Sequence, residues 1–171
     1  MGPVLVTGGA GSVGKRVVQR LCKEGYTVRV FDLPNMDYTG LEGVVGIEVL
    51  RGDITQLTSV HQAVEGVRAV IHLAALLPPA SEQRRELTFA VNVEGTARVA
   101  EALKRTNPDA PLVFSSSVST YGDTTGVKPP VMVDHSQQAL DIYAESKIAA
   151  EGSLRESYPN AVILRISGVS V

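Results

Sequence analysis

The sequence lacks the features that mark disulfide-bonded and membrane-spanning proteins. Its 171 residues include one cysteine, Cys22, so no disulfide can form within the chain. Cys22 falls on an apolar stripe of helical spacing, which favours a structural core thiol over a nucleophile. No apolar run approaches the roughly 20 residues of a membrane span, and the N-terminus leads into a predicted strand with no signal peptide. These absences predict a cytoplasmic protein that has no membrane partner.

A strong charge of one sign, internal repeats and low-complexity tracts are missing as well. The formal net charge is −2 and no basic block occurs, so the sequence predicts no nucleic-acid partner. Hydrophobic residues make up 44% and charged residues 20% of the chain, which is the balance of an ordinary globular protein. The length suits one domain with a sizeable core, and we expect that domain to span residues 1–171.

The segment VLVTGGAGSVG at residues 4–14 carries the most informative motif. Its aliphatic run predicts a strand buried on both faces, and apolar residues at helical spacing predict a helix over 13–22. Between the two lies a glycine-rich turn that satisfies the pattern G-x-G-x-x-G. Glycines let the pyrophosphate of a dinucleotide approach main-chain N–H groups at a helix N-terminus. The predicted cofactor contacts in this turn are Gly8, Gly11, Ser12, Val13 and Gly14.

An acidic residue ends the second predicted strand, which spans residues 26–31. Asp32 lies about 20 residues past the glycine turn, where a carboxylate accepts hydrogen bonds from an adenosine ribose. Its charge repels a 2′-phosphate, which favours NAD and makes NADP the weaker candidate. The alternative is a solvated acid at the end of a strand. Lys15 and Arg16 lie near the phosphate end, and solvation in a first helical turn also explains them.

The rest of the chain alternates between strand and helix patterns. Strands are predicted at 47–50, 67–75, 111–117 and 161–166. Helices are predicted at 57–64, 85–104 and 139–158, with loops at 33–45 and 77–83 and an irregular stretch at 118–138. This alternation is typical of the α/β class and predicts a parallel sheet with right-handed crossovers.

Residues that follow the third, fourth and fifth strands lie on the side where parallel sheets bind ligands. Asp53 is either an acceptor for the adenine amino group or a turn or helix-cap acid, and Ile54 is expected to pack against the adenine. Small residues after the fourth strand allow a cofactor ribose to lie close to the backbone. The predicted contacts there are Leu73, Ala74 and Ala75, with Ser115 near the end of the fifth strand.

Two polar residues occur in apolar surroundings. His72 has apolar neighbours on both sides, which favours a buried structural histidine over a catalytic one. Asn92 is the odd polar residue on the predicted helix at 85–104. It is either an anchor that faces the cofactor pocket or a core amide satisfied by backbone groups.

Tyr143 and Lys147 are four residues apart on a predicted helix and therefore share one face. A free phenol has a pKa near 10, so half-ionisation near pH 7 requires about 4 kcal/mol of preferential stabilisation of the phenolate. A lysine ammonium and an oxidised nicotinamide are suitable positive charges. Ser117 can hold a substrate oxygen while Tyr143 moves the proton. We predict Ser117, Tyr143 and Lys147 as catalytic residues, with Tyr143 and Lys147 also beside the cofactor.

The motifs occur together in one order along the chain. They are TGGAGSVG at 7–14, Asp32, GDI at 52–54, HLAA at 72–75, VNVEGT at 91–96, SSS at 115–117 with Tyr121-Gly122, and YAESK at 143–147. In this combination the chain resembles an extended short-chain dehydrogenase/reductase of the NAD-dependent epimerase/dehydratase family. The resemblance implies a Rossmann-type doubly wound sheet of strand order 3-2-1-4-5-6, helices on both faces, an NAD(P) site and the three catalytic residues. It also implies a homodimer joined through the helices that hold Asn92 and Tyr143.

The chain departs from the family pattern in two respects. Ser12-Val13 replaces the aromatic–aliphatic pair that is common in the glycine motif of sugar epimerases. Family members also continue past the sixth strand into a substrate-binding domain. We therefore expect that domain to be absent from, or truncated in, these 171 residues.

The predicted function is hydride transfer between a nicotinamide and a secondary alcohol or ketone of the nucleotide-sugar or hydroxysteroid class. Dehydrogenases, epimerases and dehydratases can all begin with this step, although no Cys or Glu pair for dehydration is evident near the triple serine. The alternative is a non-catalytic dinucleotide-binding module or redox sensor. Such a module needs the glycine turn and Asp32 but has no need of Ser117, Tyr143 and Lys147 together.

Overall fold

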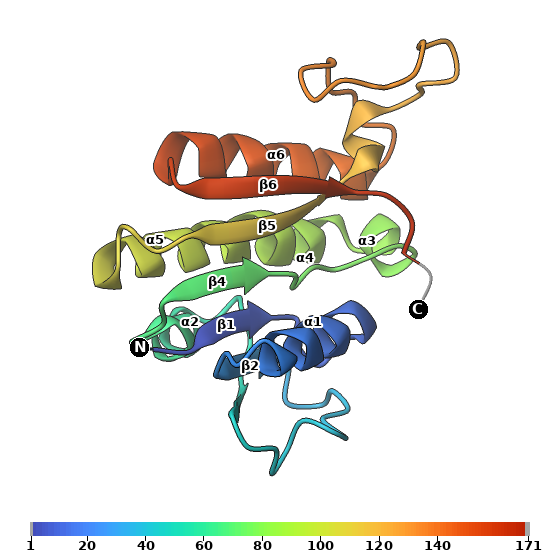
Figure 1. Ribbon diagram of the computed structural model, residues 1–171. Coiled ribbons are helices and arrows are strands. Elements are labelled where there is room, and N and C mark those ends of the chain that lie inside the picture. Colours follow the sequence, from blue (N-terminus) through green and yellow to red (C-terminus); the bar gives the residue numbers. More distant parts are fainter. Residues whose placement is uncertain (1, 170–171) are drawn as a thin grey trace.

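The computed structural model describes residues 2–169, which form one six-stranded parallel sheet (Figure 1). Its strands are β1 (Val4–Thr7), β2 (Val28–Asp32), β3 (Ile47–Arg51), β4 (Ala69–His72), β5 (Leu112–Ser117) and β6 (Ala161–Ile166). They lie in the order β3-β2-β1-β4-β5-β6, and every neighbouring pair is parallel. This arrangement confirms the predicted Rossmann-type topology. The strand order reverses direction between β1 and β4, so the loops after these two strands diverge and leave room for a ligand.

Helices cover both faces of the sheet. They are α1 (Ser12–Lys23), α2 (Leu57–Val64), α3 (Ala80–Gln83), α4 (Arg85–Phe89), α5 (Thr96–Thr106) and α6 (Ile142–Ser157). A π-helical segment, η1 (Ala90–Gly95), joins α4 to α5, and a 3₁₀ turn, η2 (Val118–Tyr121), follows β5. Figure 1 shows α5 and α6 side by side along the sheet. Among residues 2–169, no helix is long and apolar enough to cross a membrane.

Two apolar clusters hold these layers together. One lies between the sheet and α2, α5 and α6, and its buried residues include Leu5, Val70 and Leu103. The other lies between the sheet and α1, and includes Val6 and Val18. Because side chains alternate along a strand, the neighbours Leu5 and Val6 on β1 serve opposite clusters. Burial of both faces explains why the central strand β1 is a nearly continuous apolar run.

The segment between β4 and β5 differs from the predicted pattern. The sequence predicted a loop over 77–83 and one helix over 85–104, whereas α3 occupies part of that loop and α4, η1 and α5 divide the helix. Gly95 lies at the wide turn, where a Cβ atom would come within 3.0 Å of the Ile54 side chain. A π-helical turn therefore brings the helix backbone close to the loop after β3. The predicted strand at 67–75 was also too long, because β4 ends at His72.

Candidate functional site

A cleft of about 1620 Å³ opens at the carboxyl ends of the strands. Most residues that the sequence predicted for the cofactor and the reaction line this one cleft, although they come from six separate segments of the chain. They are Gly8, Gly11, Ser12, Val13, Gly14, Asp32, Asp53, Ile54, Leu73, Ala74, Ala75, Ser115, Ser117, Tyr143 and Lys147. Asn92 is the one predicted contact outside this lining.

The glycine turn between β1 and α1 leaves no space for a Cβ at Gly8 or Gly14. Gly8 has a φ of 68°, and a Cβ on it would lie 2.8 Å from the Ala74 nitrogen. A Cβ on Gly14 would lie 2.1 Å from the Gly8 carbonyl oxygen, so the first turn of α1 sits directly on the loop. No side chain caps the N-terminus of α1. This positive end of the helix dipole faces the cleft with bare backbone, which suits a pyrophosphate.

Asp32 is fixed to the glycine turn at the end of β2. Its Oδ2 accepts a hydrogen bond from the Ala10 amide at 3.0 Å, and its Oδ1 accepts one from the Leu33 amide at 2.9 Å. Burial raises the pKa of this carboxyl, and the backbone hydrogen bonds offset only part of that effect. The carboxylate has further acceptor positions, so it can also bind a ribose hydroxyl in the cleft. Nearby, Lys15 is paired with Asp37 at 2.8 Å.

Asp53 and Ile54 shape the wall next to Asp32. Asp53 Oδ1 accepts hydrogen bonds from both the amide and the hydroxyl of Thr55, each at 2.8 Å. Asp53 is therefore a turn acid, as one of the two sequence interpretations held, and it lines the cleft as well. Ile54 is 6% exposed and packs against Gly95, so its position is fixed by the core and not by a ligand.

His72 is a buried structural histidine, as predicted. It is fully buried between two threonines, with Nδ1 2.6 Å from the Thr7 hydroxyl and Nε2 2.9 Å from the Thr96 hydroxyl. Burial, followed by the positive charge of Lys147, lowers the pKa of His72 to about 3. The ring is therefore neutral at physiological pH and links β4 to β1 and α5.

The sequence left two interpretations of Asn92, an anchor that faces the pocket and a core amide. In the structure Asn92 is buried and bonded as a core amide. Its oxygen accepts a hydrogen bond from the Leu76 amide at 2.7 Å. Its nitrogen donates to the Leu76 carbonyl at 3.1 Å and to the Ser146 hydroxyl at 2.9 Å. These bonds use both amide hydrogens and one acceptor position of the oxygen, so Asn92 holds Leu76, which lines the cleft.

Lys147 and Tyr143 lie on one face of α6 at the edge of the cleft. The Lys147 Nζ lies 5.7 Å from the centre of the Tyr143 ring and 4.7 Å from that of Phe114. It donates a hydrogen bond to the Ser115 carbonyl at 2.8 Å. Lys147 is 1% exposed, and burial lowers its pKa to about 8 although the nearby Glu151 charge raises it.

The protein alone disfavours ionisation of Tyr143. Burial, and then the negative charge of Asp141, raise the pKa of the phenol above its ordinary value. The sequence argument expected the neighbouring Lys147 to favour the phenolate. In this structure Lys147 does not outweigh burial, so the pKa of Tyr143 lies above its ordinary value, and a further positive charge in the cleft would favour its ionisation.

Ser117 ends β5 and begins η2. Its Oγ accepts hydrogen bonds from the amide and the hydroxyl of Ser119, at 3.1 and 2.9 Å. A hydroxyl that accepts two hydrogen bonds keeps its own proton available for donation. Ser117 can therefore donate to an oxygen atom of a bound molecule in the cleft.

Two carboxylates that sequence reasoning missed hold the start of α6. Asp141 caps the helix by accepting from the Ala144 amide at 2.6 Å. Glu82 comes from α3 and accepts from the amides of Ile142 and Tyr143, at 2.9 and 3.0 Å. The sequence missed the cap because it predicted the helix over 139–158, which places Asp141 inside the helix, whereas α6 begins at Ile142. Glu82 gave no local signal, because it lies 60 residues earlier in the chain than Ile142.

Comparison with known proteins explains why these groups occur together. The family model described as the NAD dependent epimerase/dehydratase family matches residues 4–169, nearly the whole chain. The chain belongs to this family. A 3 beta-hydroxysteroid dehydrogenase/Delta 5-->4-isomerase of Mycobacterium tuberculosis is 33% identical over 157 residues, covering 88% of this chain and 41% of the relative.

Solved structures of the family have the same fold. A short-chain dehydrogenase/reductase superfamily protein from Agrobacterium tumefaciens with bound NAD is 36% identical, with a TM-score of 0.81 over 95% of this chain and 48% of that one. The UDP-glucose 4-epimerase of Brucella ovis in complex with NAD is 28% identical, with a TM-score of 0.83 over 96% of this chain and 51% of that one. The chain thus covers between 41% and 51% of the length of these three proteins.

Proposed function

We propose that this chain is the cofactor-binding and catalytic part of an NAD-dependent oxidoreductase or epimerase. One observation carries the proposal: Ser117, Tyr143 and Lys147 line the same cleft as the glycine turn and Asp32. A dinucleotide-binding module needs only the last two features. The presence of a proton-transfer group, a buried lysine and a hydroxyl donor in that cleft favours catalysis.

The residues present fit a dinucleotide. The bare backbone between Gly8 and Gly14 would hold its pyrophosphate, and Asp32 would accept from its adenosine ribose. The same carboxylate would repel a 2′-phosphate, which supports NAD over NADP. When bound, nicotinamide exchanges a hydride with the substrate and carries a positive charge in its oxidised form.

Tyr143 is the proposed proton-transfer group. A secondary alcohol held by Ser117 would give its hydroxyl proton to the Tyr143 phenolate, and a ketone would take that proton from the phenol. The phenolate needs positive charge nearby because burial raises the pKa of Tyr143. Lys147 would supply part of it, since a pKa of about 8 leaves most of its amine protonated at neutral pH.

We infer a small-molecule substrate with a secondary alcohol or ketone, of the nucleotide-sugar or hydroxysteroid class. Relatives with both kinds of name support this range. We further propose a cytoplasmic homodimer that pairs through the helical segments that hold Asn92 (α4, η1 and α5) and Tyr143 (α6), for which sedimentation equilibrium is the direct test.

The first experiment is calorimetric titration of the chain with NAD and, separately, with NADP. We expect NAD to bind more tightly and Asp32→Asn to remove the preference. Asp109→Asn makes the same change in the exposed turn before β5. This turn lies at the amino ends of the strands, away from the cleft, so both titrations should be unchanged. Binding of neither cofactor to the parent chain would overturn the proposal.

The catalytic part is tested with the Tyr143→Phe protein in an assay of substrate-dependent NAD reduction. Turnover should fall by about 100-fold or more, since the substitution removes the acid–base group. Tyr26→Phe, on the surface, serves as the control. Full turnover by the Tyr143→Phe protein would contradict the assigned role.

A further inference from the structure

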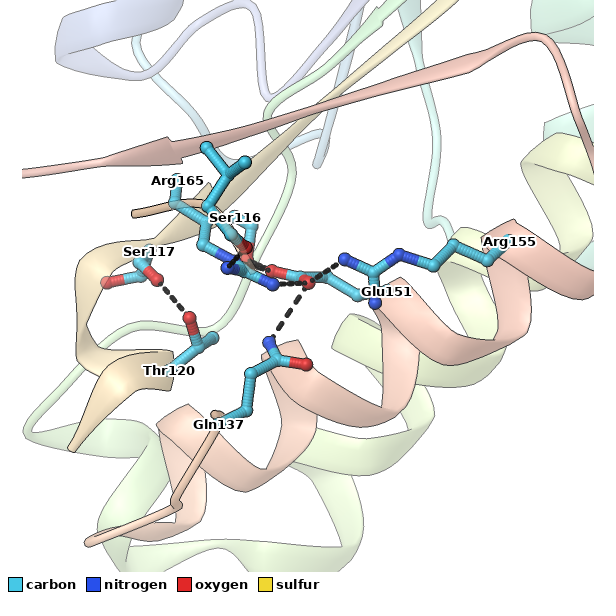
Figure 2. Close-up of polar contacts among 8 residues, drawn as sticks. Ser116, Ser117, Thr120, Gln137, Glu151, Arg155 and Arg165 are labelled. Atoms are coloured by element: carbon cyan, nitrogen blue, oxygen red, sulfur yellow. Dashed lines mark hydrogen bonds and ion pairs between the residues drawn. The ribbon is translucent and has the colours of Figure 1, made fainter. Parts of the chain in front are cut away.

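Glu151 of α6 is the only acidic residue among residues 2–169 that is buried. Its side chain is completely buried. Arg165 donates to it from both Nε and Nη2, at 3.0 and 2.8 Å, and Arg155 donates at 2.8 Å. The Ser116 hydroxyl and the Gln137 amide complete the set. Figure 2 shows these side chains converging on the carboxylate from different elements.

The contact with Ser116 ties Glu151 to the strand end that builds the site. Ser116 lies on β5 between Ser115 and Ser117, and all three residues line the cleft. The carbonyl of Ser115 accepts the hydrogen bond of Lys147. Glu151 is also one helical turn after Lys147 on α6. The carboxylate therefore joins the β5 end and α6 directly behind the proposed catalytic residues.

Arg165 links Glu151 to η2 and to the segment that follows it. Besides Glu151, it donates from Nη1 to the Val133 carbonyl at 2.9 Å. Its guanidinium lies 4.6 Å from the centre of the Tyr121 ring, which lines the cleft. Gln137 belongs to the same segment as Val133. One buried ion pair thus fixes η2 and the segment after it relative to β5, β6 and α6.

We propose that Glu151, through Ser116 and Arg165, is a positioning residue that sets the β5 end against α6 so that Ser117, Tyr143 and Lys147 face one cleft. The role rests on the proposed function, because it concerns the same three residues. Glu151 itself does not line the cleft, although its partners Ser116, Arg155 and Arg165 do, so it acts through them and is not a catalytic residue.

The ionisation of Glu151 favours a fixed arrangement of this carboxylate and its partners. Burial raises the pKa of Glu151, but the hydrogen bonds and charges of its partners lower it overall, so the carboxylate is ionised. An ionised carboxylate inside a protein persists only where its acceptor positions are satisfied. Any displacement of Ser116 or Arg165 would remove such a partner. The same negative charge favours the protonated form of Lys147.

Glu151→Gln tests the proposal because it keeps the shape and removes the charge. Glu145→Gln is the matched control: it lies on the same helix, also pairs with an arginine, and is half exposed. The first measurement is the NMR titration of the Lys147 ¹³Cε resonance in the chain without cofactor, assigned with Lys147→Arg. We expect Glu151→Gln to lower the Lys147 pKa and to shift the Ser117 amide resonance, with neither change in Glu145→Gln.

The second measurement separates positioning from general weakening. ADP occupies only the adenosine end of the dinucleotide site, which Glu151 does not approach, whereas NAD reaches the β5 end. In the Glu151→Gln protein, NAD affinity should fall by about tenfold while ADP affinity is retained. Ser116→Ala, which leaves the ion pair with Arg165 intact, should shift both readouts in the same direction by less, and it serves if Glu151→Gln does not fold.

Unchanged Lys147 and Ser117 resonances in these variants, or equal losses of NAD and ADP affinity, would overturn the positioning role. Failure of the parent chain to bind NAD would refute the proposed function instead. The NMR readout would still decide the role of Glu151 in that case, because it needs no cofactor.

Discussion

Acidification should destabilise this protein through His72 well before most of its carboxylates titrate. The Thr96 hydroxyl donates to the Asn92 carbonyl at 2.7 Å, so it accepts from His72 Nε2–H. The Nδ1 atom must then accept from Thr7. In the neutral ring the network therefore specifies one tautomer, with the proton on Nε2. Because the Thr7 hydroxyl could also accept from a protonated Nδ1, it is burial that keeps the ring neutral.

The magnitude follows from the shift in pKa between the folded and unfolded chains. His72 has a pKa of about 3 when folded and 6.5 when unfolded. Because the folded value is the lower one, its contribution is complete above pH 6.5 and is lost as the pH falls toward 3. Between about pH 7 and pH 5 the unfolded chain gains this proton and the folded one does not, which removes about 2 kcal/mol of the unfolding free energy.

Urea unfolding followed by circular dichroism at the two pH values measures the loss. His72→Gln carries an amide of similar reach that does not titrate, so its unfolding free energy should lose about 2 kcal/mol less over this interval than that of the parent. The absolute stability of the variant does not matter, since only the change with pH is compared. Equal losses in the two proteins would refute the assignment of a neutral, buried His72.

Two further substitutions probe the turn and the buried lysine. Gly14→Ala should destabilise the fold by about 3 kcal/mol or more in the same unfolding assay, because its Cβ would lie 2.1 Å from the Gly8 carbonyl oxygen. Lys147→Met should instead raise the stability at neutral pH by about 2 kcal/mol, since it removes a buried charge and loses one hydrogen bond to Ser115. Because the folded pKa of Lys147 is depressed, this gain should shrink as the pH rises from about 8 to 10.5, and a gain that does not change with pH would contradict it.

The features that the sequence predicted correctly depend on local pattern. Buried parallel strands are short apolar runs, and the turn after β1 requires glycine at Gly8 and Gly14 because neither position has space for a Cβ. Tyr143 and Lys147 share a face because helical spacing places residues four apart together. Each of these inferences needs only neighbours within a few positions in the chain.

The features that the sequence did not predict depend on contacts between residues far apart in the chain. The amide of Asn92 is satisfied by Leu76 and Ser146, and no local pattern distinguishes that use from a contact with cofactor. Glu151 lies one turn beyond Lys147 on a helix, where an acid usually faces solvent; only the fold reveals Arg165 opposite it. The residue roles that stay predictions are those toward the cofactor and the substrate.

The buried polar groups behind the cleft make the site rigid, and burying them costs folding free energy. His72, Lys147 and Glu151 are all buried, and each is tied to a strand end or to the helix that follows it. Apolar residues in these places would favour folding, since a buried charge at best offsets its own desolvation. A hydrogen-bonded charge, however, accepts only one geometry, whereas an apolar contact tolerates sliding. The stability of the fold therefore comes from the two apolar clusters that pack on the sheet. The buried polar groups fix the positions of Ser117 and Tyr143.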